Sequence, residues 1–168
     1  CGIFNDSSLY CWGTNWYGAI GNNGVVGQGQ YSPSLVALPD NNSAKSVSVG
    51  QYGGCALLID GSVYCWGLGT QGQLGNGNMS NSNIPVEVDI PIGRYATSID
   101  NGLNHACAIL DNLSIYCWGD NEHGQLGDGN NLDLSIPAEV ILPIDRTAAS
   151  YDNDIDGDGV INSKDPYP

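Results

Sequence analysis

Residues 55–67 read CALLIDGSVYCWG, and the last four letters of this stretch return at two other places in the chain. The tetrapeptide begins at Tyr10, Tyr64 and Tyr116, which lie 54 and 52 residues apart. Each copy also carries a second cysteine, ten positions before the one in the tetrapeptide. Because self-similarity at a fixed period of this length is the mark of a repeat architecture, we read the chain as three copies of one unit.

Within the unit, residues 55–65 hold two β-favouring runs on either side of Asp60-Gly61, a pattern that predicts a β-hairpin. Residues 44–49 predict a strand before the hairpin. A further strand is predicted at residues 85–88, at an edge of the sheet because Pro85 has no amide proton for a central ladder. No stretch has a sustained helical period. We therefore expect an all-β chain with four short antiparallel strands per unit, as in a propeller or a β-solenoid.

The frame of the repeat divides the chain. We expect three units followed by an unpaired strand and an acidic tail, at residues 1–43, 44–95, 96–147, 148–152 and 153–168. A strand without its own hairpin at the end of the last unit, and a hairpin without its first strand at Cys1, indicate circularly permuted units.

Tryptophan stands at the same frame position in every copy, which predicts that Trp12, Trp66 and Trp118 belong to the core. The first copy is two residues longer between its tryptophan and the next proline, and an insertion of this kind belongs in a loop. Trp16 and Tyr17 occur only in this copy, beside the insertion. They are candidates for a contact surface, with local packing as the alternative.

One part of the frame resembles a known repeat. The run Gly102-x-x-His105-x-Cys107, followed by Tyr-Cys-Trp-Gly and by Gly124-Gln-Leu-Gly, is similar to the repeat of the regulator of chromosome condensation family, over about residues 1–152. The first copy departs from the pattern at residues 18–21, and the second has Gly53 in place of the histidine. The resemblance implies a β-propeller made of four-stranded blades. Members of the family include a nuclear exchange factor, a plant photoreceptor and secreted inhibitors, so the fold leaves the function open.

Composition narrows the classes of partner. Four basic residues stand against 18 acidic ones, and the net charge of −14 opposes binding to nucleic acid or to an anionic membrane. No apolar run approaches the length of a membrane span. His105 and His123 lie in different repeat elements, and no nucleophile stands in a recognisable motif. We therefore expect no enzyme, no nucleic-acid partner and no membrane span.

All six cysteines fall into one repeated pair with ten-residue spacing. That spacing across a hairpin places both side chains on one face and close enough to bridge. Six cysteines allow fifteen pairings, and the repeat favours Cys1–Cys11, Cys55–Cys65 and Cys107–Cys117. Reduced core cysteines and metal ligation are the alternatives. Disulfides indicate an oxidising compartment, and we expect an extracellular or cell-surface location.

Four Asn-x-Ser sequons fit that compartment and fall in predicted turns or loops. Chance occurrence in a chain rich in asparagine and serine is the alternative. The candidate acceptors are Asn5, Asn41, Asn78 and Asn112.

The C-terminal residues match a twelve-residue calcium loop that begins at Asp154, with carboxylates at positions 1, 3 and 5 and glycine at position 6. Such a loop turns alternate oxygens inward toward Ca²⁺. It also resembles the calcium repeats of thrombospondin type 3, and a solvated acidic tail is the alternative. The predicted site comprises Asp152, Asp154, Asp156, Asp158, Val160, Asn162 and Asp165.

These features favour a secreted, non-enzymatic structural module with a structural calcium ion. We expect it to self-associate head to tail as a homo-oligomer or polymer, with residues 148–152 completing the hairpin that begins at Cys1 of the next copy. The alternative is a segment of a larger secreted propeller whose loops bind or inhibit a protein partner, through Trp16, Tyr17 and the inserted Val25-Val26.

Overall fold

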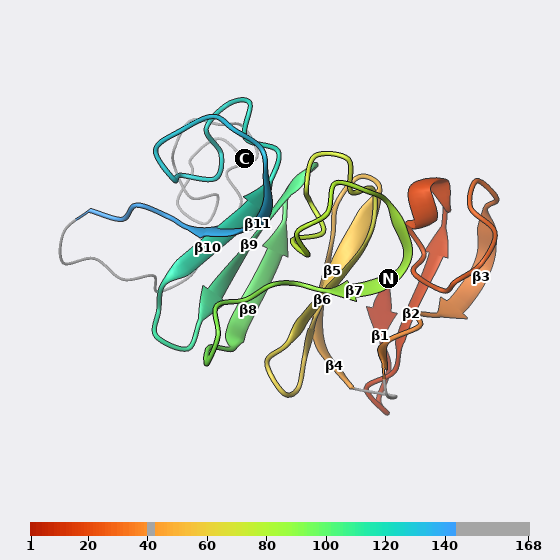
Figure 1. Ribbon diagram of the computed structural model, residues 1–168. Helices are drawn as coiled ribbons and strands as arrows, with labels where there is room; N and C mark the ends of the chain where they lie inside the picture. Colours follow the sequence, from red (N-terminus) through yellow and green to blue (C-terminus); the bar gives the residue numbers. More distant parts are fainter. Residues whose placement is uncertain (40–42, 144–168) are drawn as a thin grey trace, which may run out of the picture.

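The computed structural model describes residues 1–39 and 43–143 (Figure 1). This part of the chain is all β apart from one turn of 3-10 helix. The strands are β1 (Gly2–Ile3), β2 (Leu9–Gly13), β3 (Gln30–Leu35), β4 (Ala44–Val49), β5 (Gly53–Leu58), β6 (Val63–Gly67), β7 (Ser82–Glu87), β8 (Ala96–Asn101), β9 (His105–Leu110), β10 (Ile115–Gly119) and β11 (Leu134–Glu139), and the helix is η1 (Trp16–Gly18).

The strands form three antiparallel sheets that follow one another along the chain. The first has the order β1-β2-β3, the second β4-β5-β6-β7 and the third β8-β9-β10-β11. Figure 1 shows them side by side, each twisted against the next, as blades of a propeller. The all-β fold of four-stranded repeat units is confirmed, and β3, β7 and β11, which contain the repeated prolines, are edge strands as expected. The strand predicted at 148–152 lies outside the described residues.

The hairpin in each sheet is closed by the same side-chain brace. In the second sheet, Asp60 Oδ1 accepts hydrogen bonds from the backbone N–H and the hydroxyl of Ser62, at 3.0 and 2.6 Å. This Asx turn fixes the reversal locally, before any packing between sheets. Corresponding pairs close the other two hairpins, Asp6 with Ser8 and Asn112 with Ser114. We call this end of the sheets the hairpin end, and the opposite end, with residues 14–29, 68–81 and 120–133, the loop end.

Each of the three repeated tryptophans lies in an irregular stretch of its strand. In the second sheet the pairing of β6 with β7 shifts between Cys65 and Gly67, and Gly67 has a φ of 102°. The same shift occurs in the other two sheets. A bulge bends its strand and re-aims the side chain that it carries. The tryptophan between the two shifted residues is thereby directed toward the preceding sheet.

The core lies between the sheets. Because side chains alternate across a strand, Cys55, Leu57 and Val63 pack toward the third sheet, while Ala56 and Leu58 pack toward the first. One cluster therefore joins the first two sheets and another joins the second and third. A third cluster, built on Cys107, Ile109, Ile115, Cys117 and Leu126, covers the far side of the third sheet.

Candidate functional site

The contact between neighbouring sheets centres on tryptophan. The indole N–H of Trp66 donates to the carbonyl oxygen of Ala19 at 3.0 Å, and that of Trp118 donates to the carbonyl oxygen of Gln73 at 3.0 Å. Both side chains are buried, with exposed fractions of 1% and 0%. Ala19 and Gln73 occupy the same place in their loops. The second and third sheets therefore each send one tryptophan into the loop of the sheet before them.

Glycine makes room for this contact in the loop. A Cβ at Gly75 would lie 2.8 Å from Trp118 Nε1, and a Cβ at Gly72 would lie 2.4 Å from the carbonyl oxygen of Leu134 in β11. Both glycines have positive φ, 65° and 84°. A backbone hydrogen bond from Gly77 to Ser135, at 2.8 Å, adds to the contact. Gly18 and Gly21 repeat the close approach toward the second sheet.

The first sheet has the tryptophan of this contact without a loop to cover it, and the third sheet has the loop without a tryptophan from a following sheet. Trp12 is 48% exposed, so the expected core position is confirmed for Trp66 and Trp118 only. No sheet of the described chain precedes the first one and covers Trp12. Tyr31, which stands in β3 where Ser135 stands in β11, is 99% exposed. We call Trp12 and Tyr31 with β2 and β3 the tryptophan face.

The opposite outer surface belongs to the third sheet. Gly124 corresponds to Gly72, yet no described atom outside its immediate chain neighbours lies within 4 Å of the position of a Cβ there. Leu126 is buried in the third cluster, against its own sheet, and the partly buried Val140 and Leu142 pack against that cluster. We call residues 123–129 with this cluster the loop face. By its place in the repeat, Gln125 in this face corresponds to Gln73, whose carbonyl oxygen accepts from Trp118.

Two buried asparagines shape these loops and were missed in the sequence. Asn15 and Asn121 are 4% and 0% exposed. The Oδ1 atom of Asn15 accepts from the N–H of Ile20 at 3.1 Å, and that of Asn121 accepts from the N–H of Leu126 at 3.0 Å. The signal was available, since both asparagines follow the Trp-Gly pair at the same distance.

The predicted disulfide pairing is confirmed. Cys55 and Cys65 are direct register partners on β5 and β6, with Cα atoms 4.0 Å apart, and Cys107 pairs with Cys117 in the same way at 4.1 Å. The Cys1–Cys11 bond has a Cα separation of 4.0 Å. Each bridge joins the two strands of a hairpin and stabilises it by about 2–3 kcal/mol on the chain-entropy model.

Trp16 and Tyr17 form an aromatic cluster with Tyr52 at the loop end. The ring centroids of Trp16 and Tyr52 lie 6.3 Å apart in a stacked arrangement, and those of Tyr17 and Tyr52 lie 5.2 Å apart edge to face. Trp16 and Tyr17 remain exposed. Tyr17 has a φ of 57°, an unusual conformation for a bulky residue. The inserted Val25-Val26 is held beside them, because Asn15 Nδ2 donates to the carbonyl oxygen of Val25 at 2.9 Å.

The remaining predicted sites are only partly within the described residues. Asn5, Asn78 and Asn112 lie exposed in turns or loops, whereas Asn41 and the whole calcium loop lie outside the described residues. Within residues 1–39 and 43–143, no cluster of His, Cys, Asp and Glu side chains could hold a metal ion. His105 lies at the start of β9 and His123 in the loop after β10, so the structure leaves them on different elements.

One ion pair ties the hairpin end of the third sheet to the segment before it. Arg94 contacts Asp111 with an N–O distance of 3.0 Å. Although desolvation opposes the change, hydrogen bonds from the Tyr95 N–H and from Arg94 lower the pKa of Asp111 below its ordinary value. On β10, desolvation and the nearby Glu139 carboxylate raise the pKa of Tyr116.

The described residues include no helix of a length and apolar character suited to crossing a bilayer.

Comparison with known proteins agrees with this architecture. The regulator of chromosome condensation (RCC1) repeat model matches residues 6–57, 60–109 and 114–150. The ultraviolet-B receptor UVR8 of Arabidopsis thaliana is 29% identical over 144 residues, which cover 86% of this chain and 32% of the receptor. The human E3 ubiquitin-protein ligase HERC2 is 30% identical over 138 residues, 82% of this chain and 3% of the ligase.

Among solved structures, yeast RCC1 (Prp20) bound to Kap60 matches with a TM-score of 0.74 and 25% identity, over 83% of this chain and 34% of the yeast chain. The chain thus spans about a third or less of the length of these proteins. Matches to all three copies of the repeat show that the chain belongs to the regulator of chromosome condensation (RCC1) repeat family.

Proposed function

We propose that the chain is a secreted, non-enzymatic structural module that joins a second copy of itself head to tail. The observation that carries this proposal is the contrast between Trp12, which is 48% exposed, and its two buried counterparts, Trp66 and Trp118. Trp66 and Trp118 are at most 1% exposed because the loop of a neighbouring sheet covers them. Trp12, on the tryptophan face, has the same indole ring and could be buried in the same way by the loop of another copy.

The loop face of another copy has the complementary groups. In the docked arrangement, Trp12 Nε1 donates to the carbonyl oxygen of Gln125, as Trp118 donates to Gln73 within the chain. Tyr31 lies over Gly124, whose place for a Cβ is open, as Leu134 and Ser135 lie over Gly72. The contact joins two different surfaces and is therefore heterologous, so repetition produces a closed ring or a filament.

Residues 148–152 and the calcium loop extend this proposal beyond the described residues. The first sheet has three strands, and the place beside β1 corresponds to that of β4 beside β5. A strand donated from 148–152 of the neighbouring copy fills that place and pairs an exposed sheet edge. A calcium ion bound by residues 152–165 then neutralises clustered carboxylates next to the junction. The three disulfides support secretion, because such bonds persist in oxidising compartments.

The decisive measurement is sedimentation velocity over a range of protein concentrations. We expect the wild-type chain to form larger species as the concentration rises and the Trp12→Ala variant to stay monomeric. Trp16→Ala is the matched control, because Trp16 is similarly exposed at 54% but lies off both faces. A wild-type chain that stays monomeric throughout contradicts the proposal and favours completion of the faces by repeats elsewhere in a longer polypeptide.

A mixing experiment tests the direction of the contact. Trp12→Ala removes the tryptophan face and leaves the loop face, whereas Gly124→Ala places a methyl group on the loop face and leaves the tryptophan face. Each variant alone is expected to remain monomeric, while an equimolar mixture forms a dimer and nothing larger. Association of either variant alone would show that the contact uses other surfaces.

A second function is favoured by the aromatic cluster at the loop end. Exposed aromatic side chains are enriched in binding surfaces, and the yeast relative Prp20 has been solved bound to a protein, Kap60. Under this proposal the loop end binds a protein, and Trp16 and Tyr17 supply the anchors. Alanine at these two positions should then abolish partner binding in a pull-down and leave the sedimentation behaviour unchanged.

A further inference from the structure

The dipeptide Asn-Gly occurs three times in the chain, at Asn23-Gly24, Asn76-Gly77 and Asn101-Gly102. Glycine has no side chain, so the backbone nitrogen that follows each asparagine is unhindered. That nitrogen can attack the side-chain carbonyl carbon of the asparagine and close a five-membered succinimide ring. The reaction requires the glycine N–H to lose its proton and the asparagine side chain to turn toward the nitrogen. The structure around each dipeptide therefore decides whether the ring forms.

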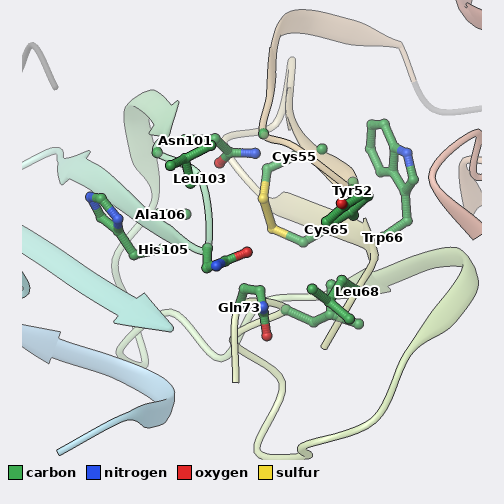
Figure 2. A pocket seen from close by; sticks show the side chains of 16 residues that line it. Tyr52, Cys55, Cys65, Trp66, Leu68, Gln73, Asn101, Leu103, His105 and Ala106 are labelled. Carbon is green, nitrogen blue, oxygen red and sulfur yellow. A yellow bond between two sulfur atoms is a disulfide. The ribbon is translucent and has the colours of Figure 1, made fainter. Parts of the chain in front are cut away.

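The segment Asn101-Gly102 is held at both reacting groups. The Gly102 N–H donates to the carbonyl oxygen of His105 at 2.9 Å, and Asn101 Nδ2 donates to the carbonyl oxygen of Ser48 at 3.1 Å. Asn101 Oδ1 is buried, and Figure 2 shows Asn101 and His105 beside a small pocket between the second and third sheets. Attack of Gly102 on Asn101 therefore requires this turn to open first.

The segment Asn76-Gly77 is held by the contact between the same two sheets. The Gly77 N–H donates to the carbonyl oxygen of Ser135 at 2.8 Å, and Asn76 Oδ1 accepts from the N–H of Asn78 at 3.2 Å. A hydrogen bond to the neutral form of a group opposes its ionisation, so the bond to Ser135 opposes loss of the Gly77 proton. Ring formation here requires the second and third sheets to separate locally.

The segment Asn23-Gly24 differs from both. Asn23 is exposed, and its carboxamide makes no hydrogen bond within the part of the chain that the structure describes. The Gly24 N–H donates to a side chain, Asn22 Oδ1, at 2.9 Å. Rotation of that one side chain releases the attacking nitrogen, without movement of a sheet. We propose that Asn23 is the Asn-Gly site that converts spontaneously to isoaspartate in the folded protein.

The conversion needs only water and hydroxide. After the Gly24 N–H has lost its proton to hydroxide, a bond forms from the Gly24 nitrogen to Cγ of Asn23. The bond from Cγ to Nδ2 breaks, and Nδ2 takes a proton from water and leaves as ammonia. Water then opens the ring. Opening at Cγ gives aspartate, and opening at the backbone carbonyl carbon gives isoaspartate, in which the main chain carries one more carbon.

This modification alters the contact between the first and second sheets. The Asn23 N–H donates to the carbonyl oxygen of Asn83 in β7 at 2.9 Å, and Asn83 Nδ2 donates to the carbonyl oxygen of Gly24 at 3.2 Å. These two bonds lie on either side of the reacting peptide and engage neither of its reacting groups. Because isoaspartate adds a carbon between them, the modified chain should lose at least one of the two bonds.

Peptide mapping by mass spectrometry tests the proposal on the wild-type chain incubated at mildly alkaline pH. One sample is native and disulfide-bonded, and the other is reduced and unfolded in guanidinium. In the unfolded chain we expect the three asparagines to convert at similar rates, because only the local sequence remains. In the native chain we expect Asn23 to convert about tenfold faster than Asn76 and Asn101. Conversion of Asn76 or Asn101 as fast as Asn23 in the native chain overturns the assignment, as does an intact Asn23 under conditions that convert the unfolded chain.

The variant Asn23→Gly tests the product. Asn23 has a φ of 59°, and Gly77 and Gly129 stand at the same place in the other copies with φ of 79° and 86°, so glycine fits the backbone here. Methylation by an isoaspartyl methyltransferase, which labels isoaspartate, should fall to background in aged native Asn23→Gly. It should stay at the wild-type level in the matched control Asn76→Ser. Undiminished labelling of Asn23→Gly, or equal loss in both variants, overturns the proposal. The inference does not depend on self-association, because the reaction takes place within one chain.

Discussion

The substitutions Gly72→Ala and Gly124→Ala measure what one sheet-to-sheet contact contributes. The two glycines have φ angles of 84° and 77° and lie at the same place in their loops. A methyl group at Gly72 would meet the backbone oxygen of Leu134 at 2.4 Å, whereas at Gly124 it would meet no described atom within 4 Å. The pair therefore shares its local strain and differs only in the neighbouring sheet.

The magnitudes follow from these distances. A left-handed conformation costs an L-residue about 1–2 kcal/mol, and this cost is common to both variants. At Gly72 the third sheet must also move by about 1 Å to restore an ordinary contact distance. Overpacking of this kind costs a further 1–3 kcal/mol, approximately. The Gly72→Ala variant should therefore have a lower melting temperature than Gly124→Ala, by about 2–4 °C for each kcal/mol of this additional cost.

Guanidinium and thermal unfolding followed by tryptophan fluorescence provide the assay, at a protein concentration at which the wild type is monomeric. Equal destabilisation by the two substitutions in dilute solution would refute the reasoning, because it would mean that the contact of Gly72 with β11 carries no energy. Raising the concentration adds a second comparison. Under the proposed self-association, Gly124→Ala should then lack the extra stability that association would give the wild type.

Other consequences of the structure can be measured separately. Trp118→Phe removes the donor to Gln73 and should destabilise the chain by about 1–3 kcal/mol, whereas Trp12→Phe should change the stability of the monomer little, as denaturant titration would show. Reduction of the three disulfides should lower the free energy of unfolding by about 2–3 kcal/mol for each bridge, measured with and without reductant. Because the pKa of Asp111 is lowered in the folded chain, its ion pair with Arg94 stabilises the fold at neutral pH and loses this effect as the pH falls below about 4; Asp111→Asn should make the melting temperature depend less on pH in the acid range. Calorimetric titration should detect one calcium ion per chain, and a chain ending before residue 153 should bind none.

The parts of the fold that follow from short-range sequence were predictable. Each hairpin turn contains an aspartate or asparagine with a serine two positions later, and both residues lie within the same short segment. The disulfides span ten residues across those turns. Because each copy repeats these signals, an error in one copy would have been exposed by the other two.

The roles that depend on a neighbouring sheet were not predictable from frame position. Trp12 and Trp118 stand in identical tetrapeptides, yet one is half exposed and the other fully buried. Gly72 and Gly124 occupy the same turn and differ only in what lies opposite. A small pocket lined by Gln73 and by Asn101 likewise draws on two neighbouring sheets, and the second copy has Val49 at the position of Asn101. A repeat pattern predicts which side chains each unit places on its surfaces, whereas the neighbouring unit decides which of them are buried.

The direction of the contact limits how such units can assemble. Each sheet offers a tryptophan on one side and a loop carbonyl on the other, so the tryptophan face has a donor and the loop face has its acceptor. Two tryptophan faces placed together would leave both indole N–H groups without the carbonyl that they use inside the chain. A symmetric dimer through like faces is therefore disfavoured, and under the proposed self-association the rule that orders sheets within the chain would also order chains. Growth by this contact stops only when a ring closes or when one face is covered by a different partner.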